Sequence, residues 1–408
     1  MEPLIISRLA HLGDGVADTP QGPVFAPFTL PGEAVTGRID DGRLPEPQVL
    51  TPSPDRVAPV CPHFGVCGGC ALQHASDGFL ADWKTQMVAA ALAARGVRAP
   101  LRPIAVSPPG SRRRVTFAGR RTRKTVVVGF HGRSDATLIP VTACAVAHPA
   151  IVAALPVCAA LVGLTASRGG EVRLSVTVTE GGLDIDLAGQ KPPDGPLRAL
   201  LAQAAAAADL ARLSYNGETI AQRRPPHQRF GRALAAPPPG GFLQATREGE
   251  AALLAAVAEI VGDAATVADL FAGSGTFALP LAGRAAVRAV EADAAALAAL
   301  DAAWRATPGL RAISVETRDL KARPLMAAEL NRFAAVVFDP PRAGAAAQAA
   351  EIAHSQVPRV AAVSCNPATF ARDARTLIDG GYRLDWAQPV DQFRWSPHVE
   401  VVGAFSRA

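Results

Sequence analysis

The chain has 408 residues, of which 49% are hydrophobic and 5% aromatic, and its formal net charge at pH 7 is +5. That length is enough for two or three domains with real apolar cores. No apolar run approaches the roughly 18 residues that cross a bilayer, and the first residues lack the pattern of a signal peptide. We therefore expect a cytoplasmic protein with no membrane partner, whose clustered cysteines are ligands or catalysts rather than disulfides.

Residues 1–53 have the pattern of a small β-barrel. Short strand-like runs cover 4–10, 22–28 and 34–40, and glycine and proline turns separate them. Closely spaced strands without a helical period favour a barrel. The stretch TPSPDRVAP that follows is typical of a linker.

Residues 54–240 are expected to form a central mixed α+β domain. Five of the six cysteines belong to it, at 61, 67, 70, 144 and 158, and a helix is predicted over about 77–95. Cys158 lies in an apolar run, so we expect it in the core. Strand-like runs follow between about 100 and 235, with an Ala-rich helix near 198–210. In 110–124 seven of fifteen residues are basic, and 223–232 contains four arginines. Arginine forks suit phosphate oxygens, which favours a nucleic-acid partner, but a solvated basic face explains the charge equally well.

Residues 241–408 are expected to form a parallel, doubly wound α/β domain. An amphipathic helix over 247–262 begins it, and apolar strands then alternate with helices. The expected strands are TVADL, AAVRAVE, RAISVE, AAVVFD, RVAAVS and VEVVGAF.

The turn after the first of these strands, DLFAGSGTF at 269–277, predicts a cofactor site. Its glycines Gly273 and Gly275 allow a ligand to approach the backbone closely. Glu291 ends the second strand, where it could bind ribose hydroxyls, and Asp319 after the third could accept from an adenine amino group. Asp339 follows the fourth strand in Asp-Pro-Pro-Arg. Acids at successive strand ends, with no phosphate-binding lysine, fit S-adenosylmethionine better than a phosphate cradle. Helix capping by Asp269 and Asp319 is the simpler alternative.

The fifth strand ends in Ser364-Cys365-Asn366-Pro367, directly before a predicted helix. A helix N-terminus lowers the pKa of a thiol, so we expect Cys365 to favour the thiolate rather than to be a buried core residue. A thiolate that adds to carbon 6 of a uracil makes carbon 5 nucleophilic enough to take a methyl group, and a base must then remove the carbon 5 proton. Glu400 is the candidate base, and a salt bridge at the strand end is the alternative.

Four motifs in series, DLFAGSGTF, DPPR, SCNP and HVE, resemble the bacterial RNA (uracil-5-)-methyltransferases over nearly the whole chain. The resemblance implies that Cys365 is the nucleophile and Glu400 the base. It also implies an S-adenosylmethionine site made by Gln244, Phe271, Gly273, Gly275, Thr276, Glu291, Asp319 and Asp339. The chain departs from the family at Thr246 and Thr276, where asparagine is common, and at 393–396.

The N-terminal stretch resembles the TRAM domain, an OB-like barrel that binds RNA. Cys61, Cys67, Cys70 and Cys144 match the family's iron–sulfur ligands, which implies a [4Fe–4S] cluster, although spacing alone does not separate a cluster from a four-cysteine zinc site. Barrel and cluster together resemble the branch that acts on 23S rRNA, and archaeal relatives with a cluster act on tRNA. We expect a monomer that methylates 23S rRNA. The alternatives are the same methylation of a tRNA uridine, a non-catalytic RNA-binding or assembly protein, and a cytosine-5 methyltransferase.

Overall fold

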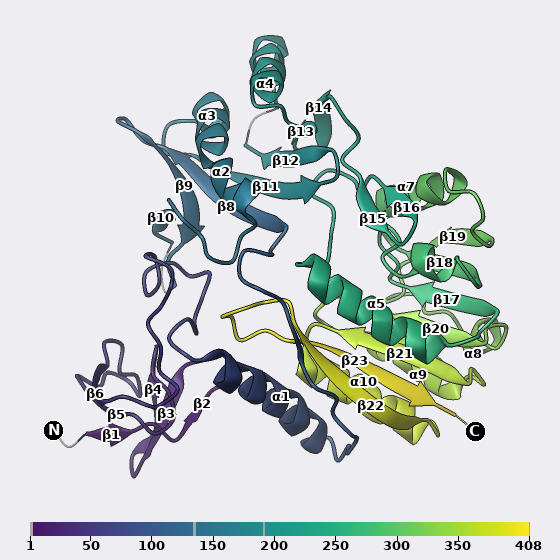
Figure 1. Cartoon of the computed structure of the whole chain (residues 1–408), viewed down its shortest axis with the longest axis horizontal. Coiled ribbons are helices and arrows are strands. Elements are labelled where there is room, and N and C mark those ends of the chain that lie inside the picture. Colours follow the sequence, from purple (N-terminus) through teal and green to yellow (C-terminus); the bar gives the residue numbers. More distant parts are fainter. Residues whose placement is uncertain (1–2, 134–135, 191, 408) are drawn as a thin grey trace.

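The computed structural model describes residues 3–133, 136–190 and 192–407. Residues 1–2, which begin the expected barrel, and 408, which ends the expected C-terminal domain, lie outside the described residues. Figure 1 shows the small N-terminal sheets at lower left, a larger sheet above them and the C-terminal α/β unit at right. Among the described residues, no helix combines the length and apolarity that crossing a bilayer requires.

The N-terminal unit consists of two three-stranded sheets, ordered β1-β5-β6 and β2-β3-β4. Their buried apolar side chains, such as Ile6, Val24 and Val35, form one core, so the unit is barrel-like as expected. The sequence patterns missed β3 and β6. The strands are β1 (Leu4–Ile5), β2 (Arg8–Leu9), β3 (Gly15–Thr19), β4 (Gly22–Ala26), β5 (Ala34–Thr36) and β6 (Gln48–Thr51).

The central unit contains a seven-stranded sheet in the order β10-β9-β8-β11-β12-β13-β14, with helices packed against it. Its strands are β8 (Arg114–Arg121), β9 (Val126–His131), β10 (Leu138–Pro140), β11 (Glu171–Thr179), β12 (Gly182–Ala188), β13 (Arg212–Tyr215) and β14 (Glu218–Gln222). Its helices are α2 (Pro149–Ala153), α3 (Leu155–Thr165) and α4 (Gly195–Ala207), and a hairpin of β15 (Gln228–Phe230) and β16 (Ala233–Ala235) follows. The expected mixed α+β character is confirmed.

The C-terminal unit is built on an eight-stranded sheet in the order β19-β18-β17-β20-β21-β23-β22-β7. Its strands are β17 (Thr266–Leu270), β18 (Ala286–Glu291), β19 (Ile313–Thr317), β20 (Ala335–Phe338), β21 (Arg359–Ser364), β22 (Arg383–Asp391), β23 (Glu400–Ser406) and β7 (Ala105–Val106). β17 to β21 are parallel, and β23 lies antiparallel between β21 and β22. Because the strand order reverses between β17 and β20, their carboxyl ends border the crevice where such sheets bind ligands.

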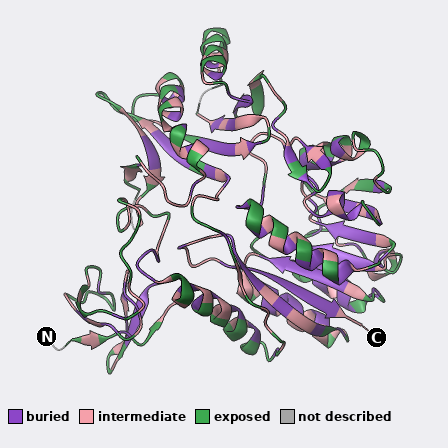
Figure 2. Ribbon diagram, viewed as in Figure 1, coloured by how far each residue is buried: buried purple, intermediate pink, exposed green. Residues whose placement is uncertain are grey.

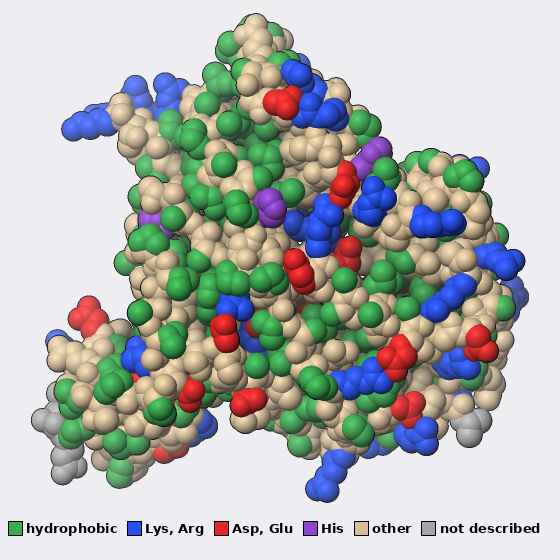
Figure 3. Space-filling model, viewed as in Figure 1, with side chains coloured by type: hydrophobic (Ala, Val, Ile, Leu, Met, Phe, Trp, Pro, Cys, Tyr) green, Lys and Arg blue, Asp and Glu red, His purple; other side chains and the backbone are tan. Residues whose placement is uncertain are grey.

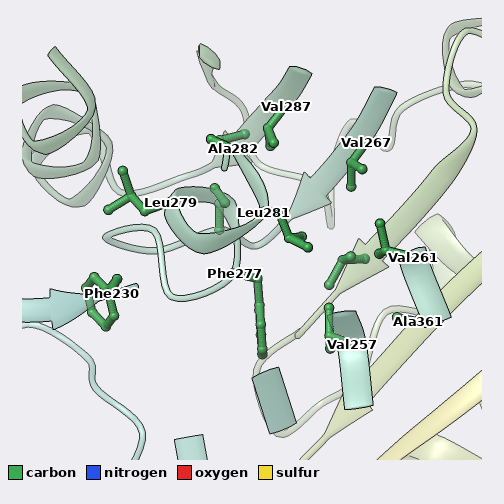
Figure 4. Close-up of a cluster of buried hydrophobic side chains, with 14 of the residues drawn as sticks. Phe230, Val257, Val261, Val267, Phe277, Leu279, Leu281, Ala282, Val287 and Ala361 are labelled. Carbon is green, nitrogen blue, oxygen red and sulfur yellow. The ribbon is translucent and has the colours of Figure 1, made fainter. Parts of the chain in front are cut away.

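Helices cover both faces of this sheet, which is buried throughout its centre (Figure 2). On one face lie α5 (Arg247–Val261), α6 (Ala278–Leu281) and α7 (Ala294–Arg305), whose apolar side chains meet Val267, Val287 and Ala361 of the strands (Figure 4). On the other face lie α1 (Asp77–Ala93), α8 (Ala327–Leu330), α9 (Ala346–His354) and α10 (Pro367–Asp379). Alternate strand residues enter the two cores, as expected for a doubly wound sheet.

The segment expected to be central therefore contributes to the C-terminal unit. β7 pairs in parallel with the end of β22, and Val88 and Leu92 of α1 pack with apolar side chains of α10. Domain boundaries at 53 and 240 remain a prediction.

The loop between β22 and β23 is held by all three parts of the chain. Trp395 in this loop is buried with Leu30 of the N-terminal unit, Leu72 beside the cysteine segment, and Leu80 and Trp83 of α1. Its carbonyl oxygen accepts the backbone N–H groups of Ala71 and Leu72 at 2.9 and 3.0 Å. The loop that precedes Glu400 is therefore held in place by packing and by backbone hydrogen bonds.

Candidate active site

The glycine turn after β17 has a backbone that suits close approach by a ligand. Phe271, Gly273 and Gly275 have positive φ angles of 64°, 52° and 99°. A Cβ at position 275 would lie 2.7 Å from Leu279 Cδ1, so only glycine fits there without displacement. The backbone N–H groups of Phe271 and Ala272 donate to Val290 O and fix the turn to β18.

Glu291, at the end of β18, closes this turn. One of its oxygens accepts the N–H of Gly273 at 3.0 Å, and the other accepts those of Ala292 and Asp293 at 2.7 and 3.0 Å. These bonds fix its carboxylate beside the turn, where lone pairs remain for further donors. Asp319 follows β19, is exposed, and accepts the N–H of Lys321 at 2.9 Å. Thr276 is partly buried in the same turn.

Asp339 lies at the carboxyl end of β20, across the switch point from the glycine turn. Gln244 Nε2 donates to its Oδ2 at 2.9 Å, so two residues expected in the cofactor site are in direct contact. Burial raises the pKa of Asp339, and the bond from Gln244 opposes that rise. Buried Asp269 below it also has a raised pKa, because of burial and the nearby charge of Asp339. The crevice therefore disfavours the ionised forms of these carboxyl groups, and a cationic ligand would stabilise them.

The segment that carries Gln244 is fixed from two sides. Thr246, where the family has asparagine, caps α5 by accepting the N–H of Gly249 at 3.0 Å. Arg113, from the first basic cluster, is buried; its Nε donates to Gln244 O at 3.0 Å and its guanidinium pairs with Glu250. This arginine supports the site and is not available to bind RNA.

Cys365 lies between β21 and α10, at the same sheet edge. Asn366 caps the helix by accepting the N–H of Ala368 at 3.0 Å, with Pro367 in the first turn, as the Asn-Pro pair predicted. The thiol is partly exposed.

The expected thiolate is not what the free protein favours. Burial, followed by the charges of Glu400 and Asp339, raises the pKa of Cys365 to about 11, although Arg342 opposes the rise. The prediction of a lowered pKa was wrong because it considered only the helix N-terminus, and neither the burial of the thiol nor the charges of Glu400 and Asp339.

Glu400 is the first residue of β23 and is only 4% exposed. Burial and the charge of Asp339 raise its pKa, whereas a hydrogen bond from Gln392 opposes this. Its Oε1 accepts that bond at 3.1 Å, and its Oε2 is buried with no hydrogen-bond partner among the residues that the structure describes. A carboxylate in this environment can act as a base near neutral pH. It forms no salt bridge with any described residue, so the alternative interpretation is not supported.

Gln392 is the site residue that sequence reasoning missed. It is 1% exposed and contacts both Gln244 and Glu400. The available signal was an amide directly after a buried strand, but a polar residue at a strand end gives no indication of its distant partners.

Cys61, Cys67, Cys70 and Cys144 line one cavity of about 690 Å³, although they come from two segments of the chain. Burial raises the pKa of Cys70 to about 12, and the other three thiols add to that rise. Cys158, expected in the core, is fully buried in α3. Among the described residues, no group of three or more His, Cys, Asp or Glu has the geometry to hold a single metal ion.

A doubly wound sheet with a glycine turn, an acid at the end of the second strand and a carboxylate at the switch point is typical of enzymes that bind a nucleoside-containing cofactor, and S-adenosylmethionine-dependent methyltransferases are one such class. The tRNA (Uracil-5-)-methyltransferase family model matches residues 238–407. An uncharacterized RNA methyltransferase of Caulobacter vibrioides is 46% identical over 100% of both chains. The chain belongs to the RNA (uracil-5-)-methyltransferase family.

Two further comparisons extend this result. The 23S rRNA (uracil(1939)-C(5))-methyltransferase RlmD of Nitrosococcus oceani is 30% identical, over 98% of this chain and 95% of the relative. A crystal structure of the Pyrococcus abyssi tRNA (uracil-54, C5)-methyltransferase with S-adenosyl-L-homocysteine covers 99% of each chain, with a TM-score of 0.77 and 20% identity. The latter confirms the fold over the whole length.

Proposed function

We propose that this protein methylates carbon 5 of a uridine in 23S rRNA through a covalent cysteine–uracil adduct. The observation that carries the proposal is the position of Cys365, which interacts electrostatically with Glu400 and Asp339 at one sheet edge. A thiol that adds to the base and a buried carboxylate that removes a proton are the two groups that this reaction requires of the protein.

In the proposed reaction the Cys365 sulfur adds to carbon 6 of the flipped-out uracil, which gives an enolate at carbons 4 and 5. Bound S-adenosylmethionine supplies the electrophilic methyl group that carbon 5 takes. Glu400 then removes the proton from carbon 5, the carbon 6–sulfur bond breaks, and the thiolate leaves. Because the free thiol is protonated at neutral pH, its proton must be lost as the substrates bind.

The cofactor residues remain those expected from the sequence. Glu291 is fixed beside the glycine turn for the ribose, Asp319 is exposed for the adenine, and Phe271 stands in the turn itself with Gly273, Gly275 and Thr276. Gln244 and Asp339 would hold the methionine end. The raised pKa of Asp339 supports this assignment, because a sulfonium cation stabilises a buried carboxylate.

The cavity that contains the four cysteines is the proposed RNA-binding surface nearest the site. It is lined by Arg43, Arg112, Arg114 and Arg133, and it extends to Phe393 and His398 in the loop before Glu400. Arginine forks and aromatic faces bind phosphates and unstacked bases. Figure 3 shows further basic side chains at the projecting tip of the β8–β9 hairpin.

We also propose that Cys61, Cys67, Cys70 and Cys144 bind a [4Fe–4S] cluster. Four thiols that line one cavity are a suitable donor set for it. Because Ala71 and Leu72 bond to Trp395, the cluster would stabilise the loop that leads to Glu400.

Trapping with 5-fluorouridine tests the proposed reaction, because carbon 5 then has no proton for a base to remove. Fluorinated RNA with S-adenosylmethionine is expected to give a stable covalent complex, and Cys365→Ala is expected to give none. An adduct that survives Cys365→Ala would exclude the proposed nucleophile.

The choice of 23S rRNA is supported by the relative described as acting on it, which matches nearly the whole chain. Mass spectrometry of rRNA and tRNA nucleosides from cells with and without the gene tests this choice. Loss of 5-methyluridine from 23S rRNA alone is expected. Loss from tRNA alone would assign the same chemistry to tRNA, and loss from neither would favour a non-catalytic role.

A further inference from the structure

The amide of Gln392 joins two parts of the active site that come from distant segments. Its Nε2 donates to Gln244 Oε1 at 2.6 Å and to Glu400 Oε1 at 3.1 Å. Its Oε1 accepts the backbone N–H of Ala245 at 2.8 Å. All three bonds are buried, where an unmade hydrogen bond costs more than it does in water.

Only one orientation of this amide satisfies its neighbours. Gln244 Nε2 donates to Asp339, so the oxygen of Gln244 is the acceptor that faces Gln392. If the Gln392 amide turned over, its oxygen would face two acceptor oxygens and its NH₂ group would face a backbone N–H. The hydrogen bonds therefore have a fixed direction, from Ala245 through Gln392 to Glu400 and, through Gln244, to Asp339.

Packing holds Gln392 in this position. Gly249 of α5 lies so close that a Cβ on it would come 2.7 Å from Gln392 Cβ and 3.1 Å from its Oε1. The helix backbone thus limits movement of the side chain, and the hydrogen bonds fix its amide.

The consequence for Glu400 is that its two oxygens differ. Oε1 accepts a bond from a group that can only donate there, and Oε2 is buried with no hydrogen-bond partner in the described part of the chain. Oε2 is therefore the oxygen free to take a proton. The titratable groups that interact with Glu400 are Asp339 and Cys365, and neither stabilises its ionised form as the Gln392 donor does.

We propose that Gln392 is a positioning residue of the methyl transfer, which presents Glu400 with Oε2 as the proton-accepting oxygen and ties this base through Gln244 to Asp339. This rests on the proposed role of Glu400 as the base that removes the carbon 5 proton. Gln392 itself does not touch the reacting atoms.

Gln392→Met tests the proposal, because methionine keeps the length of the side chain and removes both donors. Turnover of ordinary uridine RNA is expected to fall on the order of 10- to 100-fold, less than the roughly 10²- to 10⁴-fold that a general base contributes, because Glu400 itself is still present. The methylated covalent adduct should accumulate, since its resolution needs Glu400. The rising limb of the pH–rate profile should move to higher pH, because the ionised carboxylate has lost a donor. Trapping by 5-fluorouridine RNA should stay within about twofold of the unmodified enzyme, since no proton is removed there.

The control is Gln388→Met on the same strand, whose side chain only donates to Pro103 O at the surface. It should change neither turnover nor the pH profile. If Gln392→Met does not fold, Gln392→Asn keeps the amide but shortens its reach and should give the same pattern more weakly.

An unchanged pH profile and turnover would overturn the proposal, as would equal losses of trapping and turnover, which indicate general damage. Absence of an adduct in the unmodified enzyme would instead contradict the proposed function, so the two failures are distinguishable.

Discussion

Lys84 of α1 and Asp391 at the end of β22 form a buried ion pair, with 2.6 Å between Nζ and the carboxylate and side-chain exposures of 0% and 5%. Lys84 also donates to Phe393 O at 3.1 Å. These two contacts fix α1 to the loop that carries Gln392 and leads to Glu400. Burial lowers the pKa of Lys84, and Asp391 opposes that change, so the pair depends on both partners.

Lys84→Met is expected to destabilise the protein by about 3–5 kcal/mol, because it leaves the Asp391 carboxylate buried without its cation. Lys84→Met combined with Asp391→Asn should recover part of that loss, which thermal or urea unfolding of the single and double variants would measure. Arg198→Met removes an exposed pair with Glu218 and should have almost no effect. If the double variant loses the full sum of the stability losses of Lys84→Met and Asp391→Asn, the two residues are not coupled and the prediction is contradicted.

The thiol of Cys365 is expected to react slowly with iodoacetamide in the free enzyme. With a pKa of about 11, only about one thiol in a thousand is ionised at pH 8. Glu400→Gln removes the nearby charge that raises this pKa, so alkylation at pH 8 should increase several-fold. Peptide mass spectrometry distinguishes Cys365 from the other cysteines. Rapid alkylation at pH 7 would mean that the N-terminus of α10 outweighs the two carboxylates.

Ionisation of the site carboxyls should reduce the stability of the free protein as pH rises. The folded-state pKa values of Asp339 and Glu400 lie above those of the unfolded chain, which are about 4. The stability they contribute is therefore complete below about pH 4 and is lost as pH rises toward the folded values. Relative to the unmodified protein, Glu400→Gln should therefore increase in free energy of unfolding between pH 5 and 8, by about 1.4 kcal/mol per unit of pKa shift. If the melting temperatures of the two proteins change with pH in the same way over this range, the prediction is contradicted.

Anaerobic purification should give a brown protein that contains iron and sulfide in equal amounts. Cys70→Ser should lose the colour and melt at a lower temperature, because the cysteine segment supports Trp395. Cys365→Ala should keep the full iron content while losing adduct formation, which separates the cluster from catalysis. A colourless protein with one zinc per chain would replace the proposed cluster with a zinc site.

Much of the C-terminal fold could be predicted because its signals are local. The runs TVADL and RVAAVS coincide with β17 and β21, and Asn366-Pro367 begins α10 as expected. Strands and helices of this kind follow from apolar periodicity and capping within a few residues. β7 could not be found in this way, because two residues become a strand only by pairing with β22, nearly 300 positions later.

The sequence by itself determined the order of the motifs, and with it the family, the nucleophile candidate Cys365 and the base candidate Glu400. Residue type and spacing were sufficient for this, because the carboxyl ends of the parallel strands meet at one edge of the sheet. The antiparallel strand β23 begins at that same edge with Glu400. Only the tertiary structure decided whether these groups are protonated and which residues they contact. The pKa of Cys365 depends on burial and on the carboxylates of Glu400 and Asp339, and Gln392 forms hydrogen bonds with both Gln244 and Glu400. Electrostatic and hydrogen-bond energies depend on distance in space, and a linear pattern does not contain those distances.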